Sequence, residues 1–159
     1  MATPNPFEAK PDYSKPVGPP MQDIHFIRGS TPMHKAAALL KADEVDALLA
    51  AGGEDVDTGD ALNQTPLILL SRNHYDKDDV PKAVAMIEKL IAAGATIVDP
   101  ESGKCKRDDY GDSMLHLAAM ATGRNGAAIV QTLVSHLPTN GPYTKEQLVS
   151  ARCKNFGNT

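Results

Sequence analysis

Thr31-Pro32-Met33-His34-Lys35-Ala36 is the stretch that decides the fold, because its pattern returns twice along the chain. It comes back 34 residues later as Thr65-Pro66-Leu67-Ile68, and again as Ser113-Met114-Leu115-His116. Recurrence of a helix-start signal at such spacing is typical of stacked structural repeats. Each repeat then buries its apolar face against its neighbours, so the working part of the protein is expected to be a surface.

Each occurrence begins with a residue that suits the start of a helix. The hydroxyls of Thr31, Thr65 and Ser113 can accept a hydrogen bond from an unpaired amide of the first turn. Pro32 and Pro66 follow at the first helical position, where the missing amide hydrogen costs nothing. We therefore expect a short inner helix at each of these three places.

A second, outer helix is predicted after each inner helix, from apolar residues at helical spacing. The first outer helix is expected to stop at Gly52-Gly53 and the second at Gly94-Ala95. Polar stretches at 73–81, 100–108 and 138–147 predict long loops, and the segment from Tyr143 to Leu148 predicts a short extra helix. The apolar positions are Val45, Leu48 and Leu49, then Val84, Ile87, Leu90 and Ile91, then Ile129, Val130, Leu133 and Val134.

The chain resembles the ankyrin repeat family, whose signature includes Thr-Pro-Leu-His-x-Ala followed by Val-x-x-Leu-Leu-x-x-Gly-Ala. The resemblance implies an all-α fold, an ankyrin-repeat solenoid of helix-turn-helix units with protruding β-turn or hairpin loops. It covers a domain at 23–159, with repeats at about 27–59, 60–99 and 108–138 and the start of a fourth at 154–159. Ile68 departs from the pattern by replacing the histidine of repeat two, and Met114 by replacing the proline of repeat three.

The first 22 residues are rich in proline and are expected to be a disordered leader. Asn5-Pro6-Phe7 is similar to ligands of EH domains, and Pro16-Val17-Gly18-Pro19 to ligands of SH3-like grooves; chance is the favoured explanation of both. The pattern at 154–159 stops at a helix cap, so the chain is interpreted as the front part of a longer protein. An alternative is the targeting segment of a multidomain enzyme or of a secreted bacterial effector, with the catalytic domain beyond residue 159.

Composition excludes several classes of function. The net charge of -4 and the pI near 5.7 argue against a nucleic-acid binder. No apolar run approaches the length of a membrane span, so no membrane insertion is expected. Two cysteines are too few for a disulfide framework, which favours a reducing compartment. We expect a cytoplasmic monomer or, as the alternative, an effector in a host cell cytosol.

No residue of this chain carries a convincing catalytic, metal or cofactor signature. His34 and His116 are interpreted as structural groups that hydrogen-bond to the backbone or the cap hydroxyl. Cys105 and Cys153 are expected to be ordinary thiols, since neither has a local nucleophile signature. The acidic stretch 76–79 and the basic stretch 104–107 are both predicted to be solvated loops rather than a calcium or a phosphate site.

A protein partner is therefore the expected ligand, bound by the concave face of the repeats. Aromatic, arginine and methionine side chains are enriched at interface hot spots. Tyr110, Arg72 and Met120 are expected to line adjacent parts of one strip. The full set of candidate partner-binding residues is Arg28, Leu39, Arg72, Asn73, Tyr110, Asp112, Met120 and Phe156.

Overall fold

The computed structural model describes residues 26–53, 55–120 and 127–151, and this part of the chain is helical. It contains seven helices and, within the described residues, only two isolated β-bridges and no strand. The predicted leader at 1–22, the fourth repeat start at 154–159 and Phe156 lie outside the described residues. The helices are α1 (Pro32–Ala38), α2 (Ala42–Ala51), α3 (Pro66–Arg72), α4 (Val80–Ala92), α5 (Met114–Met120), α6 (Ala127–Ser135) and α7 (Lys145–Ser150).

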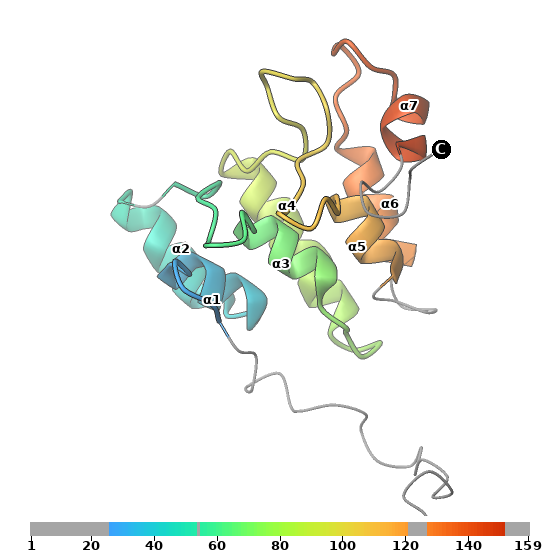
Figure 1. Cartoon of the computed structure of the whole chain (residues 1–159). Coiled ribbons are helices and arrows are strands. Elements are labelled where there is room, and N and C mark those ends of the chain that lie inside the picture. Colours follow the sequence, from blue (N-terminus) through green and yellow to red (C-terminus); the bar gives the residue numbers. More distant parts are fainter. Residues whose placement is uncertain (1–25, 54, 121–126, 152–159) are drawn as a thin grey trace, which may run out of the picture.

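The helices are arranged as pairs that lie side by side (Figure 1). Within each pair α1 packs on α2, α3 on α4 and α5 on α6. Between the pairs, α1 packs on α3 and α3 on α5, and α4 packs on α6. We call α1, α3 and α5 the inner helices, and α2, α4 and α6 the outer helices. The all-α prediction is confirmed for the described residues.

Helix starts and stops lie close to where the sequence predicts them. The side chains of Thr31 and Thr65 accept hydrogen bonds from the amides three residues later, and a proline follows each. Thr144 caps α7 in the same way. Gly52 ends α2 with a φ of +67°, as expected for a left-handed terminus. The predicted 73–81 loop is two residues too long, because a proline is tolerated in the first turn of a helix and α4 already begins at Val80.

The core lies between the two rows of helices. Ala36, Ala37 and Ala38 are buried, and their small side chains allow the inner helices to approach closely. The outer helices contribute fully buried aliphatic side chains at the predicted spacing. Those with no more than 1 % exposure are Val45, Ala83, Ile87, Leu90, Ile129 and Leu133.

A short turn precedes each inner helix, and the three turns have the same backbone geometry. We call the segments 27–30, 60–64 and 108–112 the pre-helix turns. Two residues before each cap, the backbone has a positive φ: Gly29 at +85°, Asn63 at +59° and Gly111 at +87°. Glycine adopts this conformation without strain, and asparagine is among the few other residues that tolerate it. At Gly29 a side chain would also press against the backbone nitrogen of Ala61, 3.1 Å from the added Cβ.

An aspartate organises the second and third pre-helix turns from within. Asp60 Oδ1 accepts hydrogen bonds from the amides of Leu62 at 3.0 Å and Gln64 at 2.9 Å. Asp108 Oδ1 does the same for Tyr110 and Asp112, at 3.0 and 2.9 Å. Both aspartates stand five residues before the capping residue. An aspartate that bonds to the amide two residues on is the usual way to hold a tight turn.

Backbone hydrogen bonds join each pre-helix turn to the next. The Ala61 amide donates to the Arg28 carbonyl at 2.9 Å, and the Asp109 amide donates to the Leu62 carbonyl at 2.9 Å. The two donors hold the same position relative to their caps, and so do the two acceptors. Successive turns are thus joined in one register.

His34 adds a side-chain bond between the first two turns. Its Nδ1 accepts from the Thr31 amide at 3.0 Å, so in a neutral ring Nε2 carries the hydrogen. That nitrogen lies 2.7 Å from the Gln64 carbonyl and donates to it. These are hydrogen bonds of the kind that the sequence analysis expects for His34. His116 pairs with its own cap through Ser113 Oγ, 2.6 Å from Nδ1.

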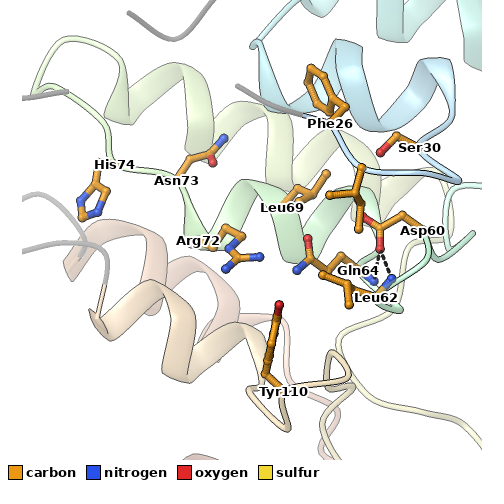
Figure 2. Close-up of a pocket in the computed structure, with 11 residues that line it drawn as sticks. Phe26, Ser30, Asp60, Leu62, Gln64, Leu69, Arg72, Asn73, His74 and Tyr110 are labelled. Atoms are coloured by element: carbon orange, nitrogen blue, oxygen red, sulfur yellow. Dashed lines mark hydrogen bonds between the residues drawn. The ribbon is translucent and has the colours of Figure 1, made fainter. Parts of the chain in front are cut away.

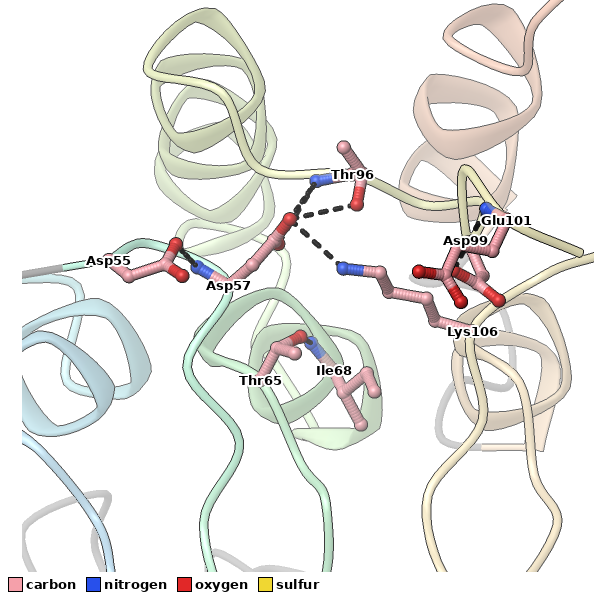
Figure 3. A network of polar contacts seen from close by, with 8 residues as sticks. All are labelled: Asp55, Asp57, Thr65, Ile68, Thr96, Asp99, Glu101 and Lys106. Carbon is pink, nitrogen blue, oxygen red and sulfur yellow. Dashed lines mark hydrogen bonds and ion pairs between the residues drawn. The ribbon is translucent and has the colours of Figure 1, made fainter. Parts of the chain in front are cut away.

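An ion pair joins the loop before α3 to the loop before α5 (Figure 3). The Asp57 carboxylate accepts from Lys106 Nζ at 2.9 Å and from the amide and hydroxyl of Thr96, the hydroxyl at 2.8 Å. The Lys106 and Asp57 side chains are 20 % and 18 % exposed. The prediction that 104–107 is a solvated loop is therefore wrong, because Cys105 is buried and pairs with Val98 in a β-bridge.

The loop between α3 and α4 is also anchored. Tyr75 is buried, and its hydroxyl donates to the Leu70 carbonyl at 2.9 Å. The Asn73 side-chain amide donates to the Ala38 carbonyl at the end of α1, at 3.4 Å. This polar loop thus contributes to the contact between successive helix pairs.

We predict that His34→Ala destabilises the fold by roughly 2–4 kcal/mol, because a fully buried side chain and its bonds to Thr31 and Gln64 are lost together. His116→Ala should cost less than half as much, since this histidine is only partly buried. Urea unfolding followed by circular dichroism measures both. Equal losses would show that the bond between turns contributes little.

We predict that Lys106→Met lowers the free energy of unfolding by about 1–2 kcal/mol, because Asp57 keeps its burial but loses its cation. Lys104→Met, in the same loop but exposed, is the control and should change it by less than about 0.5 kcal/mol. Denaturant titration of both variants checks this. A Lys106 effect no larger than that of Lys104 would contradict it.

Candidate binding pocket at the pre-helix turns

A pocket of about 290 Å³ opens where the three pre-helix turns meet the end of α3 (Figure 2). Its walls come from all three turns and from the last turn of α3. The register of the turns thus determines the shape of the pocket. Its lining residues are Phe26, Ile27, Ser30, Asp60, Leu62, Gln64, Leu69, Arg72, Asn73, His74 and Tyr110.

Three polar side chains converge on one part of this pocket. Figure 2 shows the Arg72 guanidinium, the Gln64 carboxamide and the Tyr110 hydroxyl pointing toward one another. They come from the end of α3, the second turn and the third turn respectively. Arg72 is exposed and half of the Tyr110 surface is exposed, so these two side chains are accessible from outside, whereas Gln64 is buried.

Several buried polar atoms of the pocket lining have no hydrogen-bond partner among the described residues. These atoms are Ser30 Oγ, Asp60 Oδ2 and Gln64 Nε2. Gln64 is 2 % exposed and Asp60 is 7 % exposed. A buried polar group without a partner costs about 1–3 kcal/mol, so such groups mark either structural water or a ligand.

Part of the pocket wall is apolar. This apolar wall consists of the side chains of Phe26, Ile27, Leu62 and Leu69. Ile27 is 37 % exposed, and the Phe26 ring carries Lys35 Nζ at 6.0 Å from its centroid. The pocket therefore combines an apolar wall with a polar end, as is usual for binding sites in proteins.

The structure brings together some of the candidate residues and separates others. Arg72, Asn73 and Tyr110 line the pocket. Met120 has the same position on α5 as Arg72 on α3 and is 60 % exposed, but it does not line the pocket. Of the three residues that were expected to form one strip, Arg72 and Tyr110 line the pocket and Met120 does not. The other described candidates, none of which lines it, are Arg28, Leu39 and Asp112.

Eight of the eleven lining residues lie outside the candidate set that the sequence predicts: Phe26, Ile27, Ser30, Asp60, Leu62, Gln64, Leu69 and His74. A signal existed for Asp60, because Asp108 stands at the same distance before its own cap. No comparable signal marks Leu69 or His74, which are placed by the packing of α3.

A second pocket, of about 530 Å³, lies on the side of the Asp57–Lys106 ion pair. Cys105 lines it. Burial raises the pKa of the Cys105 thiol, although the positive charge of Arg107 opposes the shift. A thiol with a raised pKa holds less thiolate and is a weaker nucleophile. The Cys105 side chain is also part of the hydrophobic core.

The described residues contain no group of three or more His, Cys, Asp or Glu side chains that could hold a metal ion. For His116, burial and the charge of Arg107 lower the pKa. In the described part of the chain, the helices are all too short or too polar to cross a membrane.

Comparison with known proteins adds no assignment: no protein-family model matches the chain, and no curated protein matches it significantly.

We predict that substitutions at two nearby pocket residues differ in their effect on stability. Gln64→Leu should change the free energy of unfolding by no more than about 1 kcal/mol, because it removes an amide that already lacks a partner. Asp60→Ala should cost about 1–3 kcal/mol, because two backbone amides lose their acceptor. Chemical denaturation of both variants measures the contrast. A large loss in Gln64→Leu would make this residue part of the structural frame.

Proposed function

We propose that residues 26–151 form an ankyrin-like solenoid that binds a partner protein with the surface of its pre-helix turns and inner helices. The chain carries no chemistry of its own in this proposal. The observation that carries it is the Arg72–Gln64–Tyr110 group, an accessible arginine and aromatic beside a buried amide without a partner among the described residues.

The repeated geometry supports the ankyrin-like part of the proposal. Positive φ angles recur two residues before Thr31, Thr65 and Ser113. Turn aspartates recur five residues before Thr65 and Ser113, and the two backbone bonds between turns join equivalent positions. Inner helices pack in one row, as stacked repeats require, and each repeat contacts its neighbours. Such a frame holds surface side chains in fixed relative positions.

The composition of the pocket supports protein recognition. Arginine and tyrosine are among the residues that contribute most to binding energy at protein interfaces. Here they flank an apolar wall, and Met120 extends the same row of helices with another exposed apolar side chain. A flexible or extended segment of a partner could contact all of these groups.

The titratable groups support a role without catalysis. Ring nitrogens of His34 and His116 are used in bonds to their own caps. The thiol of Cys105 is buried and its pKa is raised by that burial. None of these groups combines exposure with a neighbouring base, which an activated nucleophile needs.

We expect partner binding to depend on the pocket. A photo-crosslinking amino acid at Tyr110 should capture a protein from cells, whereas the same amino acid at Lys82 on α4 should not. For the captured partner, Arg72→Ala and Tyr110→Ala should each raise the Kd by about tenfold or more, as truncation of a hot spot does. Isothermal titration calorimetry measures the change.

Lys104→Ala is the matched control, because an exposed charge outside the pocket should alter the Kd by less than about threefold. Circular dichroism must show unchanged folding in all three variants. Capture from Lys82 alone, or full affinity in the Arg72 and Tyr110 variants, would place the partner on the outer helices.

A further inference from the structure

The polar end of the pocket has an unusual balance of donors and acceptors. Arg72 brings a permanent positive charge and several N–H donors in one plane. Gln64 Nε2 is a buried donor with no partner among the described residues. The Tyr110 hydroxyl points to the same place (Figure 2). Donors from three separate elements therefore face a common point.

We propose that this group recognises a carboxylate, and that the carboxylate is an Asp or Glu side chain of the partner protein. The inference rests on the proposed function and names the chemistry that the pocket selects. An arginine fork matches the two oxygens of a carboxylate, and a neutral amide N–H and a phenol complete the coordination without adding charge.

The charge of the pocket favours a monoanion. Arg72 is the one permanently charged cation among the lining residues, and Asp60 is a lining carboxylate. Because the Asp60 carboxylate already offsets the charge of Arg72, every negative charge of a ligand adds to the pocket without compensation. A carboxylate adds one such charge and a phosphate group nearly two, so the pocket disfavours the phosphate more than the carboxylate.

The other groups of the pocket indicate what stands next to the acidic residue. The apolar wall of Phe26, Ile27 and Leu69 suits an adjoining aliphatic or aromatic side chain of the same segment. Ser30 Oγ and Asp60 Oδ2 offer acceptors for a backbone N–H of that segment, and neither has a hydrogen-bond partner within the described residues. The expected ligand is therefore a peptide segment with an acidic residue beside an apolar one.

Small probes test the carboxylate site without the partner. The protein is labelled with ¹⁵N, and the side-chain signals of Arg72 Nε–H and Gln64 Nε2–H₂ are followed by NMR. The probes are N-acetyl-glutamate methylamide, N-acetyl-glutamine methylamide and inorganic phosphate. The glutamate probe should shift both signals in a saturable way, with an affinity at least about tenfold higher than that of the glutamine probe.

Variants test the role of each donor. Arg72→Gln should abolish the preference for the glutamate probe, whereas Lys104→Gln, at an exposed cation outside the pocket lining, should leave it unchanged. Tyr110→Phe removes only the hydroxyl and should weaken the glutamate probe severalfold. Urea midpoints of the three variants show whether folding is intact.

Four outcomes would overturn the inference. The first is equal affinity for the glutamate and glutamine probes, and the second is tighter binding of phosphate. The third is the absence of any saturable shift, which would show that structural water, and not a ligand, bonds to the buried polar atoms. The fourth is a concentration-dependent shift without probe together with a dimer mass in light scattering, since a second copy of the chain would then occupy the pocket. If cross-linking at Tyr110 captures no protein but the glutamate probe binds, the proposed protein partner is contradicted. If cross-linking succeeds but the glutamate probe does not bind, the proposed carboxylate recognition is contradicted.

Discussion

The backbone hydrogen bonds between successive pre-helix turns are the constraint on which the rest of the structure depends. The bond from Ala61 to Arg28 and the equivalent bond from Asp109 to Leu62 fix how far one inner helix stands from the next. The positive φ at Gly29, Asn63 and Gly111 gives every turn the shape that these bonds require. Because the turns are held in one register, the space enclosed between them is also defined. The pocket is a consequence of that spacing.

Equivalent positions of the inner helices do not always hold the same kind of residue. On α1, His34 bonds to the next pre-helix turn, whereas Ile68 occupies the same position on α3 and is fully buried. Gln64 provides the carbonyl that His34 uses, yet its own side-chain nitrogen has no partner among the described residues. A residue whose backbone is hydrogen-bonded but whose buried side-chain nitrogen has no partner lowers the stability of the fold. Natural sequences concentrate such costs at functional sites.

Local signals explain why the sequence predicted the helices well. A cap such as Thr31 acts on an amide three residues away, and a glycine such as Gly52 ends its own helix, so both effects are encoded within a few residues. The Asp57–Lys106 pair joins loops that are distant in sequence, and no local sequence pattern indicates it. For this reason the prediction of a solvated loop at 104–107 is wrong. The pocket was half predictable, because position within a repeat placed Arg72 and Tyr110 on one face, whereas Asp60 and Leu69 required the packed structure.

The position seven residues after the cap is occupied by a different residue on each inner helix, and this variation determines the chemistry of the surface. Seven residues after the caps stand Ala38, Arg72 and Met120, on three inner helices that pack in one row. Ala38 is buried, while Arg72 and Met120 are exposed. The frame fixes where these side chains stand but imposes little on which residue occupies the position, since exposed sites contribute little to stability. Substitution along this row can therefore change the chemistry of the surface without loss of the turn bonds, and in this chain the row places the positive charge of Arg72 beside the buried amide of Gln64 (Figure 2).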